Sequence, residues 1–174
     1  MKTKEFTFKS ATGVCDIYGC RYTPDDDAVK AVIAINHGMA EHQARYRDFV
    51  SFLTSNGFAV YMHDMANHGK SNNDKNLTGY FGKKDGYKAL VKDFDSVVKI
   101  AKTDYPDKKL VIMGHSMGSF IVRCYTAWYP NAGFDGAIYM GTGGSNPIAG
   151  VGDFVSSLIA KVTGYKKKVA LLDK

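Results

Sequence analysis

The sequence predicts an α/β fold in which a mostly parallel β-sheet carries helices on both faces. Short apolar runs alternate with amphipathic helical segments along the chain, an order that is typical of parallel sheets. The runs are apolar throughout rather than on alternate residues, which indicates strands buried on both faces. Alternating polar and apolar residues near the N-terminus add an antiparallel hairpin at one end of the sheet.

The strands follow from these patterns in order. Polar and apolar residues alternate over 4–9 and again over 14–22, and the turn 23–27 ends the hairpin. Continuous apolar runs then predict buried strands at 31–35 and 58–62, and further strands follow at 110–113 and at 136–140, where the sheet would end in an open edge.

The helices occupy the intervals between the buried strands. Apolar residues at helical spacing predict helices over 45–55, 87–101 and 117–128. The first of these ends at Asn56-Gly57, a common C-terminal signal. The Gly- and Asn-rich stretch 67–82 is predicted to be a loop.

Composition excludes several classes of protein. The 174 residues contain no apolar run near the ~20 residues of a membrane-spanning helix, and the charged start does not resemble a secretory signal. Three cysteines without a CxxC spacing make a disulfide framework improbable, so we expect a reducing, cytoplasmic setting. The net charge is +6, but the basic residues are spread, and their densest cluster is Lys166-Lys167-Lys168. We therefore expect a solvated basic surface and no nucleic-acid partner.

The pattern G-x-S-x-G occurs once, as Gly114-His115-Ser116-Met117-Gly118, between a predicted strand and a predicted helix. A sharp turn there would hold Ser116 in a strained conformation with its hydroxyl above the sheet, the arrangement called a nucleophile elbow. The flanking glycines would let strand and helix approach closely. The bland alternative is a tight turn with a capping serine, but the strand before it and the helix after it favour a nucleophile.

A second segment, His37-Gly38-Met39, directly follows the buried strand 31–35. An oxyanion hole needs two N–H donors beside the nucleophile, one of them the amide that follows the serine. We therefore assign the backbone amides of Met39 and Met117 as candidate donors. Plain apolar packing is the alternative for both methionine side chains.

These motifs together resemble the α/β-hydrolase superfamily, specifically its monoacylglycerol lipase/lysophospholipase group, which includes serine aminopeptidase-like hydrolases. The features that carry the resemblance are His37-Gly38 with Glu41-His42, Arg45-Tyr46, Asp64 with His68-Gly69-Lys70-Ser71, Asp104-Tyr105-Pro106, and the elbow. The resemblance implies that Ser116 is the nucleophile, that Gly38, Gly114, His115 and Gly118 support the site, and that the substrate is a monoacylglycerol, lysophospholipid or similar acyl ester. It implies no metal or organic cofactor, and no histidine or acid shows metal-ligand spacing. Asn67 stands where the family usually has glycine, and asparagine can still adopt a left-handed turn.

The resemblance also implies that the chain is one part of a larger hydrolase. Residues 1–145 would form the N-terminal part of the core and 146–174 the start of a cap, with a modest helix over 154–162 and the C-terminal strands absent. The triad order in this fold is serine, acid, histidine, yet all five histidines precede Ser116. His37 and His115 are the plausible substitutes for the base, and we expect both to fix loops instead.

We therefore expect a serine ester hydrolase whose 174 residues are inactive or nearly so alone, and whose remaining C-terminal part is a possible partner. Two other functions stay open: a non-catalytic binding module on the same fold, and a peptidase or amidase of the same superfamily.

Overall fold

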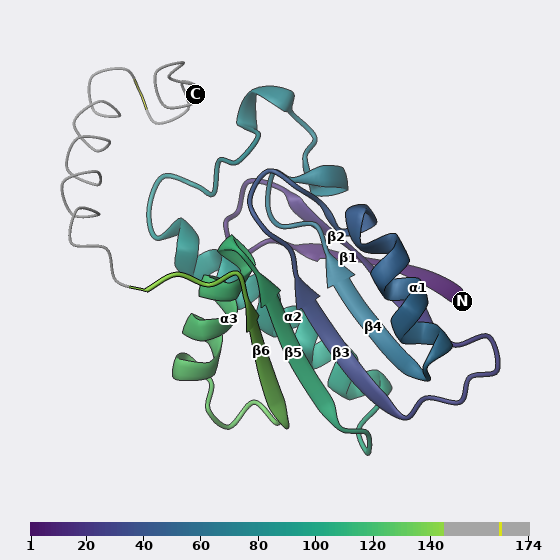
Figure 1. The fold of residues 1–174 in the computed structure, drawn as a ribbon. Helices are drawn as coiled ribbons and strands as arrows, with labels where there is room; N and C mark the ends of the chain where they lie inside the picture. The colour runs from purple at the N-terminus through teal and green to yellow at the C-terminus, as the bar shows by residue number, and fades with distance from the viewer. Residues whose placement is uncertain (145–163, 165–174) are drawn as a thin grey trace. The chain divides into compact units, whose positions relative to one another are not determined.

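The computed structural model describes residues 1–144 and 164, and these form a six-stranded sheet with the order β1-β2-β4-β3-β5-β6 (Figure 1). The strands are β1 (Lys2–Lys9), β2 (Asp16–Thr23), β3 (Ala31–Asn36), β4 (Phe58–His63), β5 (Leu110–His115) and β6 (Gly136–Met140). β1 pairs antiparallel with β2, and β2 pairs antiparallel with β4. β3 pairs parallel with both β4 and β5, and β5 pairs parallel with β6. The prediction of a mostly parallel sheet with an N-terminal hairpin is confirmed.

Three α-helices connect the parallel strands: α1 (Arg47–Ser55), α2 (Gly86–Asp104) and α3 (Met117–Trp128). The first begins two residues later than predicted, because the turn Gln43–Tyr46 before it is a 3-10 helix. The predicted loop 67–82 also contains two short 3-10 turns, Gly69–Ser71 and Lys75–Leu77.

The helices cover both faces of the sheet, as predicted (Figure 1). The larger core lies on the face of α2 and α3, where Phe94 and Tyr125 pack edge to face at 5.3 Å over strand residues such as Ile112. The smaller core lies on the other face, where Val50 and Leu53 of α1 are buried against β3, β4 and β5. Alternation along each buried strand therefore supplies both cores at once.

β6 forms an edge of the sheet in the described part of the chain. Its residues Ile138, Tyr139 and Met140 are all exposed. The chain divides into two compact units, Met1–Thr142 and Gly143–Lys174. The helix predicted over 154–162, and with it nearly all of the predicted cap segment 146–174, lies outside the described residues. No helix in the described residues is long and apolar enough to span a membrane.

Candidate active site

Ser116 lies at the sharp turn between the end of β5 and the start of α3. Its backbone has φ 51° and ψ −120°, a conformation that an L-residue adopts only at a cost. The Ser116 N–H donates to the Met140 carbonyl at 2.9 Å, and its carbonyl accepts from the Ser119 hydroxyl at 2.6 Å. The side chain is exposed and makes no capping hydrogen bond. Among residues 1–144 and 164, nothing is hydrogen-bonded to the Ser116 hydroxyl, which the turn presents at the carboxyl edge of the sheet.

Two glycines of the motif allow this turn to press against the end of β3. A Cβ on Gly118 would lie 2.3 Å from the Asn36 carbonyl oxygen and 2.4 Å from the His37 carbonyl oxygen. A Cβ on Gly114 would lie 2.3 Å from the Gly118 carbonyl oxygen. Real Cβ atoms do not approach backbone oxygens so closely, so only glycine fits at either position.

The loop that follows β3, residues 37–41, lies beside the turn at Ser116. A Cβ on Gly38 would lie 3.2 Å from the Ser116 Cβ and 3.4 Å from the His115 Nδ1. His37 and Ser116 are 79 positions apart in the sequence. The structure therefore brings together two distant segments that the sequence assigned to one site.

The amides on either side of Met39 already have acceptors. The Gly38 N–H donates to the Glu41 carboxylate, and the Ala40 N–H makes a long hydrogen bond of 3.4 Å to the His68 Nε2. Within the described residues, nothing accepts a hydrogen bond from the Met39 N–H or the Met117 N–H. Met117 is the first residue of α3, where backbone amides lack partners inside the helix. These are the two amides that the sequence assigned as donors.

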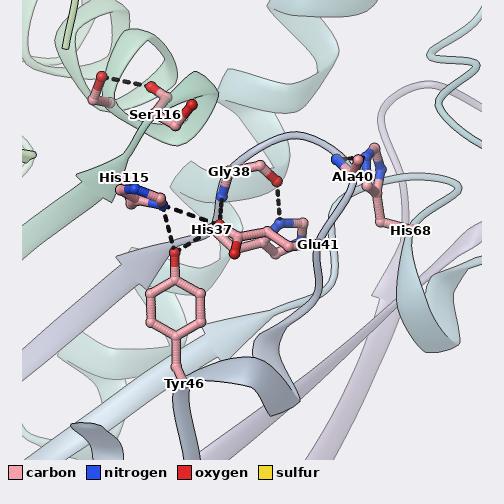
Figure 2. Close-up of polar contacts among 9 residues, drawn as sticks. His37, Gly38, Ala40, Glu41, Tyr46, His68, His115 and Ser116 are labelled. Atoms are coloured by element: carbon pink, nitrogen blue, oxygen red, sulfur yellow. Dashed lines mark hydrogen bonds and ion pairs between the residues drawn. The ribbon is translucent and has the colours of Figure 1, made fainter. Parts of the chain in front are cut away.

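Glu41 connects the loop to the end of β5 (Figure 2). Its carboxylate accepts a hydrogen bond from the Tyr46 hydroxyl at 2.8 Å and lies 3.1 Å from the His115 Nδ1. Burial alone would raise the pKa of Glu41, but hydrogen bonds from Tyr46, His115 and the Gly38 N–H outweigh it and lower the pKa. Glu41 is therefore a charged acceptor that ties the loop to His115, the residue before Ser116.

His37 cannot act as a base from where it lies. Its Nδ1 contacts the Gly38 carbonyl at 2.7 Å, and its Nε2 accepts from the Met65 N–H at 2.9 Å. The ring is fully buried, and burial lowers the pKa of His37 to about 4. Both ring nitrogens are thus engaged in holding the loop, as the sequence suggested.

His115 is also a loop contact in this structure. Its Nδ1 lies 3.1 Å from both Glu41 and the Tyr46 hydroxyl, and within the described residues no hydrogen bond joins it to Ser116. A carboxylate beside an imidazole is the usual pairing for a catalytic base, but here the pair joins the loop after β3 to the end of β5.

The turn after β4 accommodates the unusual asparagine. Asn67 has φ 55°, so it adopts the left-handed conformation expected for a residue that replaces glycine. Its side-chain amide donates to the Tyr80 carbonyl, and its own carbonyl accepts from the Gly79 N–H at 3.2 Å. Asparagine therefore ties down the following loop in a way that glycine could not.

We predict that Asn67→Gly lowers the free energy of unfolding by about 1 kcal/mol, since the turn survives while the side-chain hydrogen bond is lost. Asn67→Ala should cost about 2 kcal/mol, because alanine also resists the left-handed conformation. Urea unfolding followed by circular dichroism measures both values. Equal values for the two variants would contradict a role for the backbone conformation at this position.

Comparison with known proteins places this geometry in a family. Residues 27–168 match the family model described as "Serine aminopeptidase, S33". The chain belongs to this family of α/β-hydrolases. A monoacylglycerol lipase from Mycolicibacterium smegmatis is 32% identical over 169 residues, which are 95% of this chain and 54% of that protein. The human monoglyceride lipase is 31% identical over 111 residues, 64% of this chain and 35% of that protein.

Solved structures of α/β-hydrolases share the fold. A thermostable carboxyl esterase from Bacillus coagulans superposes with a TM-score of 0.86 at 30% identity, over 99% of this chain and 55% of that one. A lipase in an open form superposes with a TM-score of 0.69 at 28% identity, over 79% of this chain and 44% of that one. The chain therefore spans about half the length of the hydrolases that it most resembles among these.

The sequence predicts the turn at Ser116 and the loop 37–41, but it does not predict the hydrogen bonds that fix this loop. Glu41, Tyr46 and His68 were visible only as parts of motifs, and the structure shows that they fix the loop. Glu41 and Tyr46 stand in the segment after the strand 31–35, and His68 stands in the segment after 58–62. The sequence alone gives no hydrogen-bond partner for any of them.

Proposed function

We propose that this protein is part of a serine hydrolase that cleaves carboxylic esters through an acyl-enzyme on Ser116. In this reaction the Ser116 Oγ attacks the acyl carbonyl carbon, and the Met39 and Met117 amides hold the resulting oxyanion. The observation that carries the proposal is the strained, exposed serine beside a loop whose central amide has no acceptor within the described residues.

The proposed substrates are monoacylglycerols, lysophospholipids or similar acyl esters. The relatives named as monoacylglycerol and monoglyceride lipases support this class. The Met39 side chain, 67% exposed, is available to contact an acyl chain near the nucleophile.

The general base and its acid are proposed to come from a further part of the protein. No histidine follows Ser116 in these 174 residues, and His37 and His115 are engaged elsewhere. A serine without its base retains only the acceleration that the oxyanion hole and binding provide. We therefore expect the 174-residue chain to hydrolyse esters very slowly, about 10⁶-fold below a complete enzyme.

A fluorophosphonate probe tests the role of Ser116. The native protein is first weighed intact, because a mass above 19.1 kDa would show that it contains more than these residues. We expect the probe to label the native protein at Ser116 and a 1-monoacylglycerol to be hydrolysed, with both signals lost in Ser116→Ala. Unchanged ester turnover in that variant, with no labelling of the native protein, would overturn the proposal and favour a non-catalytic binding module.

A peptidase is the second candidate, because the matching family model is described as a serine aminopeptidase. Assays of the native protein with aminoacyl p-nitroanilides beside the monoacylglycerol separate the two. Cleavage of the anilides alone would establish peptidase chemistry on the same serine.

A further inference from the structure

A groove of about 610 Å³ lies between α2 and α3, away from the nucleophile turn. One wall is a stripe of α2, in which Asp95, Val98, Lys99 and Lys102 follow at helical spacing. Seven residues of helix rise by about 10 Å, which sets the length of this wall. The residues share a face because they are three or four positions apart.

The opposite wall is aromatic. It consists of Tyr129 and Trp128, the latter with 46% of its surface exposed, and Tyr129 stacks on the fully buried Tyr125 with ring centroids 5.0 Å apart. Pro130 and Ala132 continue this wall into the loop after α3. Most of the groove therefore offers apolar and aromatic surface to a ligand.

The two ends of the groove differ in charge. At one end Asp95 is neutralised, because its carboxylate pairs with the Lys99 Nζ at 2.6 Å and accepts from the Tyr125 hydroxyl at 3.2 Å. At the other end Lys102 makes no ion pair within residues 1–144 and 164. Thr103, the next residue of α2, and Asn131, in the loop after α3, also line the groove and supply further polar groups.

Lys102 is held at the mouth of the groove. Its Cε lies 3.5 Å and its Nζ 3.9 Å from where a Cβ on Gly133 would be, so the side chain reaches from α2 to the loop after α3. The nearby Asp135 already pairs with Lys109 at 2.7 Å. A lysine in the last turn also suits the helix dipole, but that role does not require an aromatic wall opposite.

We propose that this groove binds an amphipathic monocarboxylate, with the carboxylate at Lys102 and the apolar body along the aromatic wall. The site is distinct from the nucleophile, since Ser116 and Trp128 are twelve helical positions apart, about 18 Å. A fatty acid released by ester hydrolysis would belong to this ligand class, since it joins a carboxylate to an apolar chain. Only this choice of ligand rests on the proposed function.

Trp128 provides the measurement, because the chain has one tryptophan. Its fluorescence is followed while the protein is titrated with octanoate, octan-1-ol or octyltrimethylammonium below their micelle concentrations. We expect a saturable change with octanoate, about tenfold weaker binding of the alcohol, and no saturable binding of the cation. Equal responses to all three ligands, or no response to octanoate, would overturn the proposal.

Two variants locate the carboxylate. Lys102→Gln should weaken octanoate about tenfold and leave octan-1-ol unchanged, whereas Lys92→Gln, the same change on an exposed position of α2 outside the groove, should alter neither. Ser116→Ala should keep the full octanoate response, because the groove does not include Ser116. Octanoate binding can therefore be observed even if the ester hydrolase proposal fails. Octanoate affinity that is unaffected by Lys102→Gln would show that the lysine does not bind the head group.

Discussion

Gly118→Ala is expected to lower the free energy of unfolding by about 3 kcal/mol or more and to abolish labelling of Ser116. The new Cβ would lie 2.3 Å and 2.4 Å from two backbone carbonyl oxygens at the end of β3. Backbone cannot rotate away as a long side chain can, so α3 must move outward and take the nucleophile turn with it. Urea unfolding measures the loss of stability.

Gly144→Ala is the matched control for this substitution. A Cβ at Gly144 would meet nothing within 4 Å, and its backbone is not left-handed. We expect that variant to stay within about 0.5 kcal/mol of the original protein. A Gly118→Ala protein with the same stability as the control would show that β3 and α3 do not approach as closely as described.

Acid is expected to destabilise the protein strongly below pH 6.5, because two buried histidines must remain neutral. Burial lowers the pKa of His37 to about 4 and that of His63 to about 3. Between these values and 6.5 the unfolded chain binds protons that the folded chain does not, so stability falls as the pH falls. Each histidine contributes at most about 1.4 kcal/mol per pH unit. The loss ends near pH 4 for His37 and near pH 3 for His63.

The slope of unfolding free energy against pH tests this account. His63 is the more informative position, since neither ring nitrogen has a hydrogen-bond partner in the described residues and a charge there would be unpaired. His63→Asn should remove up to half of the slope between pH 6.5 and 4.5. His42→Asn, a change at an exposed histidine, should leave it unchanged. Identical slopes in all three proteins would exclude buried histidines as the cause.

The strands β3, β4 and β5 were predictable because their apolar runs are continuous, but each of the three runs further than its pattern. β3, β4 and β5 extend past the predicted ends at Ile35, Met62 and Met113 to Asn36, His63 and His115. These polar residues interrupt the hydrophobic signal while their backbones remain in the strand. The apolar pattern of each strand therefore ends one or two residues before the strand itself does, at the carboxyl edge of the sheet.

The hydrogen bonds that hold the loop 37–41 were not predictable in the same way. Glu41 meets His115 across 74 positions, and His68 meets Ala40 across 28. Hydrogen bonds of this kind depend on the path of the chain in space, and no periodic pattern records them. The sharp turn at Ser116 between β5 and α3 was predictable because its residues are consecutive and its glycines are required by close packing.

At Met39 the backbone amide and the side chain have separate roles, because only the amide is proposed to act as a hydrogen-bond donor. Glu41 and His68 accept hydrogen bonds from the amides of Gly38 and Ala40, the two neighbours of Met39. The proposed donor is the backbone amide of Met39 itself. Met39 is 67% exposed, and its side chain plays no part in that donation. Any side chain except proline can therefore be placed at this position without removing the proposed donor. If the proposed ester hydrolysis holds, residue 39 is thus a position at which substitution would change which substrate shapes fit while the backbone donor is retained.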